Sequence, residues 1–121
     1  MIGYVTLGTN DMEAAAPFYD ALAKELGGAR QMEFPGSFIA WGGGGPMISL
    51  IKPFDGKPAS VGNGVMVALA ATSKEQVDRL HAVALENGGV CEGPPGNRMD
   101  GFYAAYFRDR EGHKLNAFYM G

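Results

Sequence analysis

The sequence predicts an α+β fold that contains two tandem βαβββ modules. Two observations predict it. A pattern of one strand, one helix and three short strands occurs twice along the chain. The two copies align without a gap from the first strand through the helix, at a constant offset of 62 residues that places Tyr4 on Met66 and Phe18 on Leu80. Because each copy is too small to bury its own sheet face, the two copies must pack together.

Length and composition favour one globular domain over residues 1–121. A chain of 121 residues is the usual size of a single domain, and 46% hydrophobic with 19% charged residues is ordinary for one. The 19 glycines exceed the average usage of about 7%, which favours tight turns between short strands. We expect half-modules at about residues 1–53 and 64–121, joined by a linker at 54–63 that is rich in proline and glycine.

Charge and cysteine usage exclude several classes of protein. The net charge is −3 without runs of like charge, so no nucleic-acid partner is expected. Cys91 is the sole cysteine, which excludes an internal disulfide and cysteine-rich metal sites, and we expect it to be a small buried residue. Strand-like sequence begins directly at residue 1, and no apolar run approaches the roughly 20 residues of a membrane span. A cytoplasmic protein without a membrane partner is therefore expected.

The first module begins with an alternating strand at residues 2–8. A helix should follow at about residues 11–25, started by the capping-box-like pair Asn10 and Glu13. Pro17 lies inside this helix, and an interior proline removes a hydrogen bond and clashes with the preceding turn. We expect a kink there, or a first turn that restarts at Pro17.

Three short strands should complete the first module, at about residues 29–34, 37–41 and 46–52. Four consecutive glycines, Gly42 to Gly45, separate the second strand from the third. A phosphate-binding loop would need a helix after the glycines, whereas the sequence that follows is strand-like. The glycine run therefore indicates a flexible hairpin.

The second module repeats the pattern. A strand at residues 65–69 precedes a capping box at Thr72–Glu75 and a helix that extends to about Asn87. Three further strands are expected at residues 90–92, 102–108 and 114–119, with a loop at 93–101.

The chain resembles the glyoxalase / bleomycin-resistance / extradiol-dioxygenase superfamily, which has the vicinal oxygen chelate fold. The resemblance covers the whole chain, and its most specific part is the hairpin Tyr106–Leu115, which is similar to the family's aromatic–Asp–x–x–Gly–(Asn/His)–x–apolar pattern. The other matching features are Leu7–Asp11 at the end of the first strand, the helix pair Phe18-Tyr19, and Gly62-Asn63-Gly64 before the second module.

The resemblance implies a cupped mixed sheet with helices on its convex side, and a small-molecule pocket enclosed between the two half-cups. Strand alternation then assigns the side chains to faces. The residues expected to face the helices are Val5, Leu7, Val67, Leu69, Leu115 and Ala117. The residues expected to face the cup are Tyr4, Thr6, Met47, Ser49, Ile51, Met66, Ala68, Lys114, Asn116 and Phe118.

Metal-dependent members of the family hold a divalent ion with four side chains drawn from histidine, glutamate and glutamine. The resemblance places these four positions at Tyr4, Ser49, Met66 and Asn116. None of the four is a histidine or a carboxylate, and thioether, amide and hydroxyl groups are poor ligands for a catalytic divalent ion. We therefore expect no metal and no other cofactor.

The expected site is the cup lining, which is mostly apolar with a few polar groups, as is typical of small-molecule sites. The same side chains could instead fill the cup as core. The ligand-binding candidates are Tyr4, Thr6, Trp41, Met47, Ser49, Met66, Tyr106, Asn116 and Phe118. They predict a protein that binds a small organic molecule without metal.

Catalytic residues are not identifiable from the sequence. His81 should lie near the buried stripe of the second helix, His113 is expected in a solvated turn near the rim of the cup, and Cys91 has no histidine close to it in sequence. The alternative function is a lyase, isomerase or dioxygenase-like enzyme of the same superfamily, for which Tyr4, Asn116, His113 and Lys114 are the groups to test. The resemblance also implies a homodimer.

Overall fold

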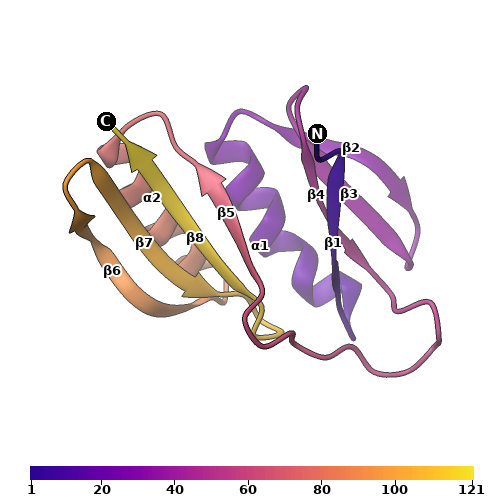
Figure 1. The fold of residues 1–121 in the computed structure, drawn as a ribbon. Coiled ribbons are helices and arrows are strands. Elements are labelled where there is room, and N and C mark those ends of the chain that lie inside the picture. Colours follow the sequence, from indigo (N-terminus) through magenta and orange to yellow (C-terminus); the bar gives the residue numbers. More distant parts are fainter. The chain divides into compact units, whose positions relative to one another are not determined.

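The computed structural model describes all residues 1–121 and contains two compact units, Met1–Val61 and Gly62–Gly121 (Figure 1). Each unit has one strand, one helix and three further strands, which confirms the α+β fold of two tandem βαβββ modules. The elements of unit 1 are β1 (Tyr4–Gly8), α1 (Met12–Glu25), β2 (Ala29–Phe34), β3 (Phe38–Gly42) and β4 (Met47–Ile51). Those of unit 2 are β5 (Met66–Ala70), α2 (Lys74–Glu86), β6 (Val90–Met99), β7 (Phe102–Arg108) and β8 (Lys114–Met120).

Each unit has its own four-stranded mixed sheet. The strand orders are β1-β4-β3-β2 and β5-β8-β7-β6, so the first strand of each module lies at a sheet edge. That strand pairs in parallel with the last strand of its module, and the other pairs are antiparallel. One helix packs against each sheet, α1 on β2, β3 and β4, and α2 on β6, β7 and β8. Neither helix is long and apolar enough to cross a membrane. The single cup expected from the two modules stays a prediction.

The repeat found in the sequence is also a structural repeat. β1 and β5 begin at Tyr4 and Met66, and α1 and α2 begin at Met12 and Lys74, the same offset in both cases. The expected strands at 29–34 and 102–108 have the bounds that were predicted, and the remaining predicted ends differ from the observed ones by at most two residues, except for the end of β6.

Both helix starts differ from the predicted capping pattern. The cap of α1 is Asp11, whose Oδ1 accepts a hydrogen bond from the Ala14 amide at 3.1 Å, because Asn10 instead pairs with the linker residue Ala59. The cap of α2 is Ser73, whose Oγ accepts from the Gln76 amide at 3.0 Å. α1 also continues through Pro17 without restarting, since the residues on either side bury a common face against the sheet.

β6 is much longer than the predicted strand at 90–92. It reaches Met99, and residues expected to form a loop pair with β7, including Gly93 with Tyr106 and Gly96 with Ala104. β6 is an edge strand and its register shifts several times, so the prolines in this segment remove no ladder bond that a central strand would need. The prediction of a loop here was wrong for that reason.

The core of each unit lies between its helix and its sheet. In unit 1 the largest fully buried side chains are Phe18, Tyr19, Trp41 and Leu50. In unit 2 they are Val77, Leu80, Phe107 and Leu115. These residues have the helix and strand spacings that place them on the inner faces of their elements.

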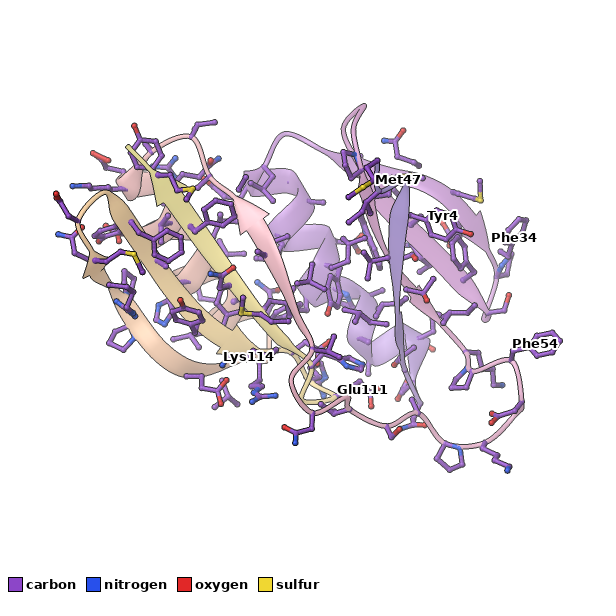
Figure 2. The ribbon with its side chains drawn as sticks, viewed as in Figure 1. Tyr4, Phe34, Met47, Phe54, Glu111 and Lys114 are labelled. Carbon is purple, nitrogen blue, oxygen red and sulfur yellow. The ribbon has the colours of Figure 1, made fainter.

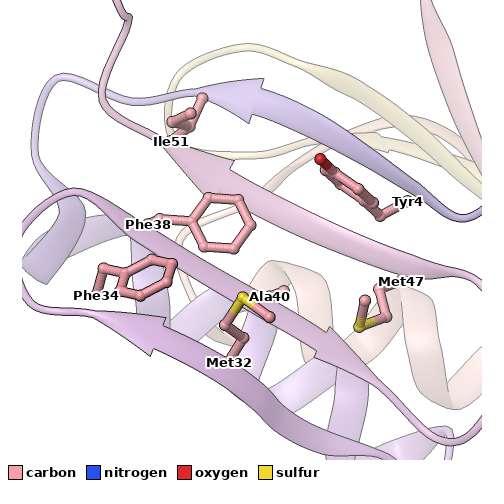
Figure 3. A pocket seen from close by; sticks show the side chains of 7 residues that line it. All are labelled: Tyr4, Met32, Phe34, Phe38, Ala40, Met47 and Ile51. Carbon is pink, nitrogen blue, oxygen red and sulfur yellow. The ribbon is translucent and has the colours of Figure 1, made fainter.

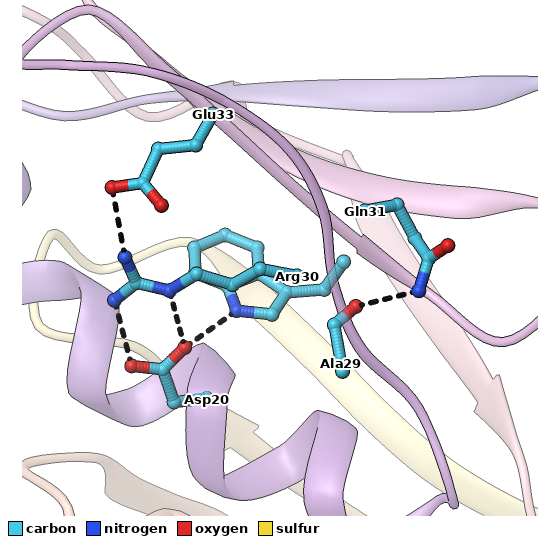
Figure 4. Close-up of polar contacts among 6 residues, drawn as sticks. Asp20, Ala29, Arg30, Gln31 and Glu33 are labelled. Atoms are coloured by element: carbon cyan, nitrogen blue, oxygen red, sulfur yellow. Dashed lines mark hydrogen bonds and ion pairs between the residues drawn. The ribbon is translucent and has the colours of Figure 1, made fainter.

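A polar cluster joins α1 to the sheet of unit 1. The carboxylate of Asp20 on α1 accepts hydrogen bonds from Arg30 Nε and Arg30 Nη2, both at 2.8 Å (Figure 4). Its Oδ1 also accepts a hydrogen bond from Trp41 Nε1 at 2.7 Å. Arg30 donates in addition to Glu33 at 3.1 Å. The hydrogen bonds from Arg30 hold the pKa of Asp20 below its usual range, against the opposing effect of burial. The Asp20 carboxylate therefore accepts the hydrogen bond of the buried Trp41 indole N–H and at the same time forms an ion pair with Arg30.

We expect Asp20→Asn to lower the free energy of unfolding by about 1 kcal/mol at pH 7, since the pair is partly exposed. The folded-state pKa of Asp20 is lowered, so this contribution is present above the unfolded-state pKa of about 3.9 and is lost as pH falls through the folded-state pKa. Urea unfolding at pH 7 and at pH 3 should show the difference between the variant and the wild type shrinking at the lower pH. Asp100→Asn, at an exposed carboxylate, is the control. An equal difference at both pH values would contradict the assignment.

Candidate functional site

Unit 1 contains a pocket of about 370 Å³ on the face of its sheet that points away from α1 (Figure 3). Every strand of the sheet contributes to it. Its lining residues are Tyr4, Met32, Phe34, Phe38, Ala40, Met47 and Ile51. Tyr4, Phe34 and Met47 lie together on this unit in the wider view (Figure 2).

The register of the strands explains which side chains meet in the pocket. Tyr4 pairs with Met47 across β1 and β4, Phe38 pairs with Ile51 across β3 and β4, and Met32 pairs with Ala40 across β2 and β3. Paired residues point to the same side of a sheet, whereas their neighbours along the strand point to the other side. Period-2 alternation in each strand therefore builds the lining.

A small residue at the centre of the sheet leaves the space. Ala40 is only 1% exposed and lies between its cross-strand partners Met32 and Ser49, so it forms the floor of the pocket. In unit 2, Tyr106 holds the equivalent place, because it pairs with Asn116 on β8 as Ala40 pairs with Ser49 on β4. The two modules therefore differ in side-chain size at the position that opens the pocket.

The pocket is aromatic and apolar. Tyr4 meets Phe38 edge to face with ring centroids 6.5 Å apart, and Phe34 lies 6.0 Å from Phe38. Tyr4, Phe34 and Met32 are each about half exposed, so the pocket presents an accessible and largely apolar surface. The single polar group among the lining side chains is the Tyr4 hydroxyl. A lining of this kind suits apolar groups, and the one hydroxyl is able to form a hydrogen bond.

Four of the predicted site residues besides Trp41 belong to unit 1. Tyr4 and Met47 line the pocket. Thr6 and Ser49 pair with each other on the same face of the sheet but lie outside the lining, and the Ser49 hydroxyl donates to the Val5 carbonyl at 2.8 Å. Ile51, also expected to face the cup, lines the pocket as well.

The predicted position of Trp41 was wrong. Trp41 follows Ala40 along β3 and so points to the opposite face of the sheet, where it is 2% exposed. Its ring stacks on Tyr19 of α1 with centroids 5.3 Å apart, and its Nε1 donates to Asp20. It is a core residue of unit 1 and does not line the pocket.

The other four predicted residues lie in unit 2, on the face of the sheet that points away from α2. They are Met66, Tyr106, Asn116 and Phe118. Tyr106 and Asn116 are cross-strand partners, and Phe118 stacks on Phe102 at 5.9 Å. They form a group of their own on that sheet, and their role in binding stays a prediction.

The sequence reasoning missed Met32, Phe34, Phe38 and Ala40. A signal for them was present, because Met32 and Phe34 alternate with Glu33, and Phe38 and Ala40 alternate with Ile39. The alternation shows which residues share a face. The burial of Ile39 against α1 then shows which face the pocket occupies.

Three residues with reactive side chains have surroundings that the sequence did not predict. Cys91, expected to be buried, is exposed, since it lies on the edge strand β6, and His81 Nε2, ten residues earlier in the chain, is 3.2 Å from its Sγ. Burial lowers the pKa of His81. His113, expected in a solvated turn, is buried, and its backbone amide donates to Asp109 Oδ1 at 2.9 Å.

The residues at the four metal-ligand positions do not fit a divalent ion. The Ser49 hydroxyl already donates to a backbone carbonyl, Met66 has a thioether, and Asn116 has a neutral amide. Tyr4 carries a phenol whose neighbours in the pocket are apolar. No group of three or more histidine, cysteine, aspartate or glutamate side chains is placed to hold a metal elsewhere in the chain.

Two features characterise the class of this protein. They are the tandem repeat of a βαβββ module and an apolar pocket on the sheet face that no helix covers. The sequence model of the Glyoxalase/Bleomycin resistance protein/Dioxygenase superfamily matches residues 1–117. The chain belongs to this superfamily.

Several solved structures are similar to the chain. A glyoxalase/bleomycin resistance protein from Albidiferax ferrireducens T118 is 38% identical, with a TM-score of 0.92, over 100% of this chain and 99% of that one. A hypothetical protein from S. aureus is 27% identical, with a TM-score of 0.76, over 98% of this chain and 92% of that one. A lactoylglutathione lyase from Agrobacterium tumefaciens, 23% identical with a TM-score of 0.72 over 98% and 92% of the two chains, shares the fold. No curated protein matches the chain in sequence.

Proposed function

We propose that this protein binds a small, largely apolar organic molecule and does so without the divalent metal of its superfamily. The pocket of unit 1 carries the proposal: a cavity of about 370 Å³ lined by aromatic, thioether and aliphatic side chains and one phenol. Small-molecule sites typically have about 300–1,000 Å³ and an apolar lining with a few polar groups.

The chemistry of the lining indicates the kind of molecule. Burial of apolar area supplies about 25 cal/mol per Å², so a ligand with one or two rings gains most of its affinity from contact with Phe34, Phe38 and the two methionines. Aromatic rings and methionine sulfur add favourable contacts with a ligand ring. The Tyr4 hydroxyl is the group that can accept or donate a hydrogen bond and fix the orientation of the ligand.

Titration with 2-naphthol tests the proposal, since this probe has two rings and one hydroxyl. The chain has seven methionines, and methyl labelling of methionine gives one NMR signal for each. The signals of Met32 and Met47, which line the pocket, should shift and saturate. The signal of Met12, at the start of the helix α1 that packs on the other side of this sheet, serves as the internal control and should stay in place. If the pocket signals do not move, or if all signals move alike, the pocket is not the binding site.

The metal-free part of the proposal has its own test. Purified untagged protein should contain less than about 0.1 divalent ion per chain, and Zn²⁺, Ni²⁺, Mn²⁺ or a chelator should leave its melting temperature unchanged, because the candidate ligands are neutral and partly engaged. Elemental analysis and thermal unfolding measure both quantities. One bound ion per chain, with a melting temperature that falls on chelation, would contradict this part and favour the lyase or dioxygenase alternative.

A further inference from the structure

Gly42, the last residue of β3, lies beside Met47 of the unit 1 pocket. The pair Trp41 and Ile48 is followed by Gly42 and Met47, which therefore lie opposite each other on the pocket face of the sheet. Figure 3 shows the thioether of Met47 turned toward the end of β3. A Cβ atom at Gly42 would lie 2.7 Å from Met47 Cγ and 3.6 Å from Met47 Cβ. The Met47 side chain therefore occupies space that any other residue at position 42 would fill.

The backbone does not require a glycine at this place. Gly42 lies in a strand, and its φ is outside the left-handed region that favours glycine. In unit 2 the equivalent residue is Arg108, because Tyr106 holds the place of Ala40 and Arg108 lies two residues further along β7. The fold accommodates the long side chain of Arg108, which forms an ion pair. The absence of a side chain at Gly42 is therefore explained by the room that it leaves for Met47.

The backbone of Gly42 is held in place on the side of β2. Ala29 pairs with Gly42, and Gln31 Nε2 donates to the Gly42 carbonyl at 3.0 Å. Gly28 lies against the same carbonyl, since a Cβ atom there would meet the Gly42 oxygen at 2.7 Å. Methionine, in contrast, has three rotatable side-chain bonds. A side chain at position 42 should therefore displace Met47 and leave β3 where it is.

The displaced side chain would reduce the space for a ligand. Tyr4 is the partner of Met47 on β1, on the opposite side of β4 from Gly42. A thioether that leaves Gly42 turns toward Tyr4, and both Tyr4 and Met47 line the pocket of about 370 Å³. The space lost is the space next to the single hydroxyl of the lining.

We propose that Gly42 sets the size class of the ligand. Planar aromatic molecules with two fused rings bind because Met47 lies over Gly42, and with a side chain at position 42 the pocket favours molecules with one ring. This inference rests on the proposed function, because it concerns the same pocket, and it adds the class of ligand and the residue that selects it. Gly42 acts through Met47 and is a positioning residue.

Gly42→Ala, titrated with 2-naphthol and with phenol, tests the inference, since the two probes carry the same hydroxyl and differ by one fused ring. We expect the alanine to weaken the binding of 2-naphthol about tenfold and that of phenol less than about twofold, because a hydrophobic pocket that loses space discriminates against the larger ligand. The methyl signal of Met47 should also move in the ligand-free variant, whereas the signal of Met12, at the start of α1, should stay in place.

A double-mutant cycle with Met47→Ala separates positioning from a general effect on the structure. Without the thioether, alanine at position 42 displaces nothing, so Gly42→Ala should then change the affinity for 2-naphthol by less than about twofold. The methyl signal of Met32, which also lines the pocket, follows the titration in these variants. An equal loss for both probes, or a loss that persists without Met47, would overturn the inference and leave the proposed function intact. Absence of saturable binding to the wild type would refute the proposed function and the inference with it.

A second variant covers the case in which Gly42→Ala does not fold. Met47→Ala, with Gly42 retained, removes the side chain that the glycine positions. The binding preference should then shift by about threefold or more from 2-naphthol toward the longer 4-phenylphenol, because the pocket gains space. An unchanged preference would overturn the inference.

Discussion

Replacing Ala40 by leucine is expected to weaken the binding of 2-naphthol by about tenfold or more while the protein stays folded. Ala40 is the floor of the unit 1 pocket, and the three added carbons extend into the cavity of about 370 Å³. They take the place of a ligand ring and remove the apolar contact that supplies most of the affinity. Because Ala40 is only 1% exposed, the larger side chain must displace the neighbours that cover it, and we expect the usual overpacking cost of about 1–3 kcal/mol. Titration followed by the methionine methyl signals measures the change.

The matched control is Ala82→Leu, which adds the same carbons at an exposed position of α2 in unit 2. It should bind 2-naphthol as the wild type does. Unchanged binding in Ala40→Leu, with the fold verified by circular dichroism, would show that the ligand does not enter this pocket.

Trp41→Ala should lower the free energy of unfolding by about 3–5 kcal/mol, the range for removing a large aromatic side chain from a core. Trp41 is 2% exposed, stacks on Tyr19, and satisfies Asp20 through its indole N–H. Its removal leaves a cavity and takes one hydrogen bond from a carboxylate. Urea unfolding followed by circular dichroism measures the loss, with the unfolding of the two units fitted separately where the transition is not a single step.

Trp41→Phe separates packing from ligand binding. It keeps most of the stacking and loses the N–H, so its cost should be smaller, about 1–3 kcal/mol, and its affinity for 2-naphthol should equal that of the wild type. A variant of normal stability that no longer binds the probe would instead restore Trp41 to the ligand site that the sequence predicted.

The repeat, the two helices and most strand bounds were predictable because they depend on residues close together in the chain. Alternation in β1 and β4 correctly placed Tyr4, Met47 and Ile51 on one face, and this required nothing beyond the period of a strand. The capping residues were off by one position. Asn10 and Asp11 are both good caps, and the contact of Asn10 with distant Ala59 leaves the capping role to Asp11.

The site was predicted less well, because its residues are brought together by packing between elements and not by the pattern of neighbouring residues. Trp41 and Ala40 are neighbours in sequence, and the pattern states that they face opposite ways without stating which face α1 covers. The pairing of β6 with β7 beyond residue 92 depends on its edge position, and the approach of Cys91 to His81 depends on how α2 lies over that strand.

The chain's local pattern therefore established the α+β class, the duplication and the residues that share each face, since strand and helix periods come from backbone geometry. The floor at Ala40 and the burial of Trp41 depended on the folded sheet and on the helix packed against it. Each results from contacts between different elements of the fold, and which partner a side chain meets is decided by strand register and helix packing.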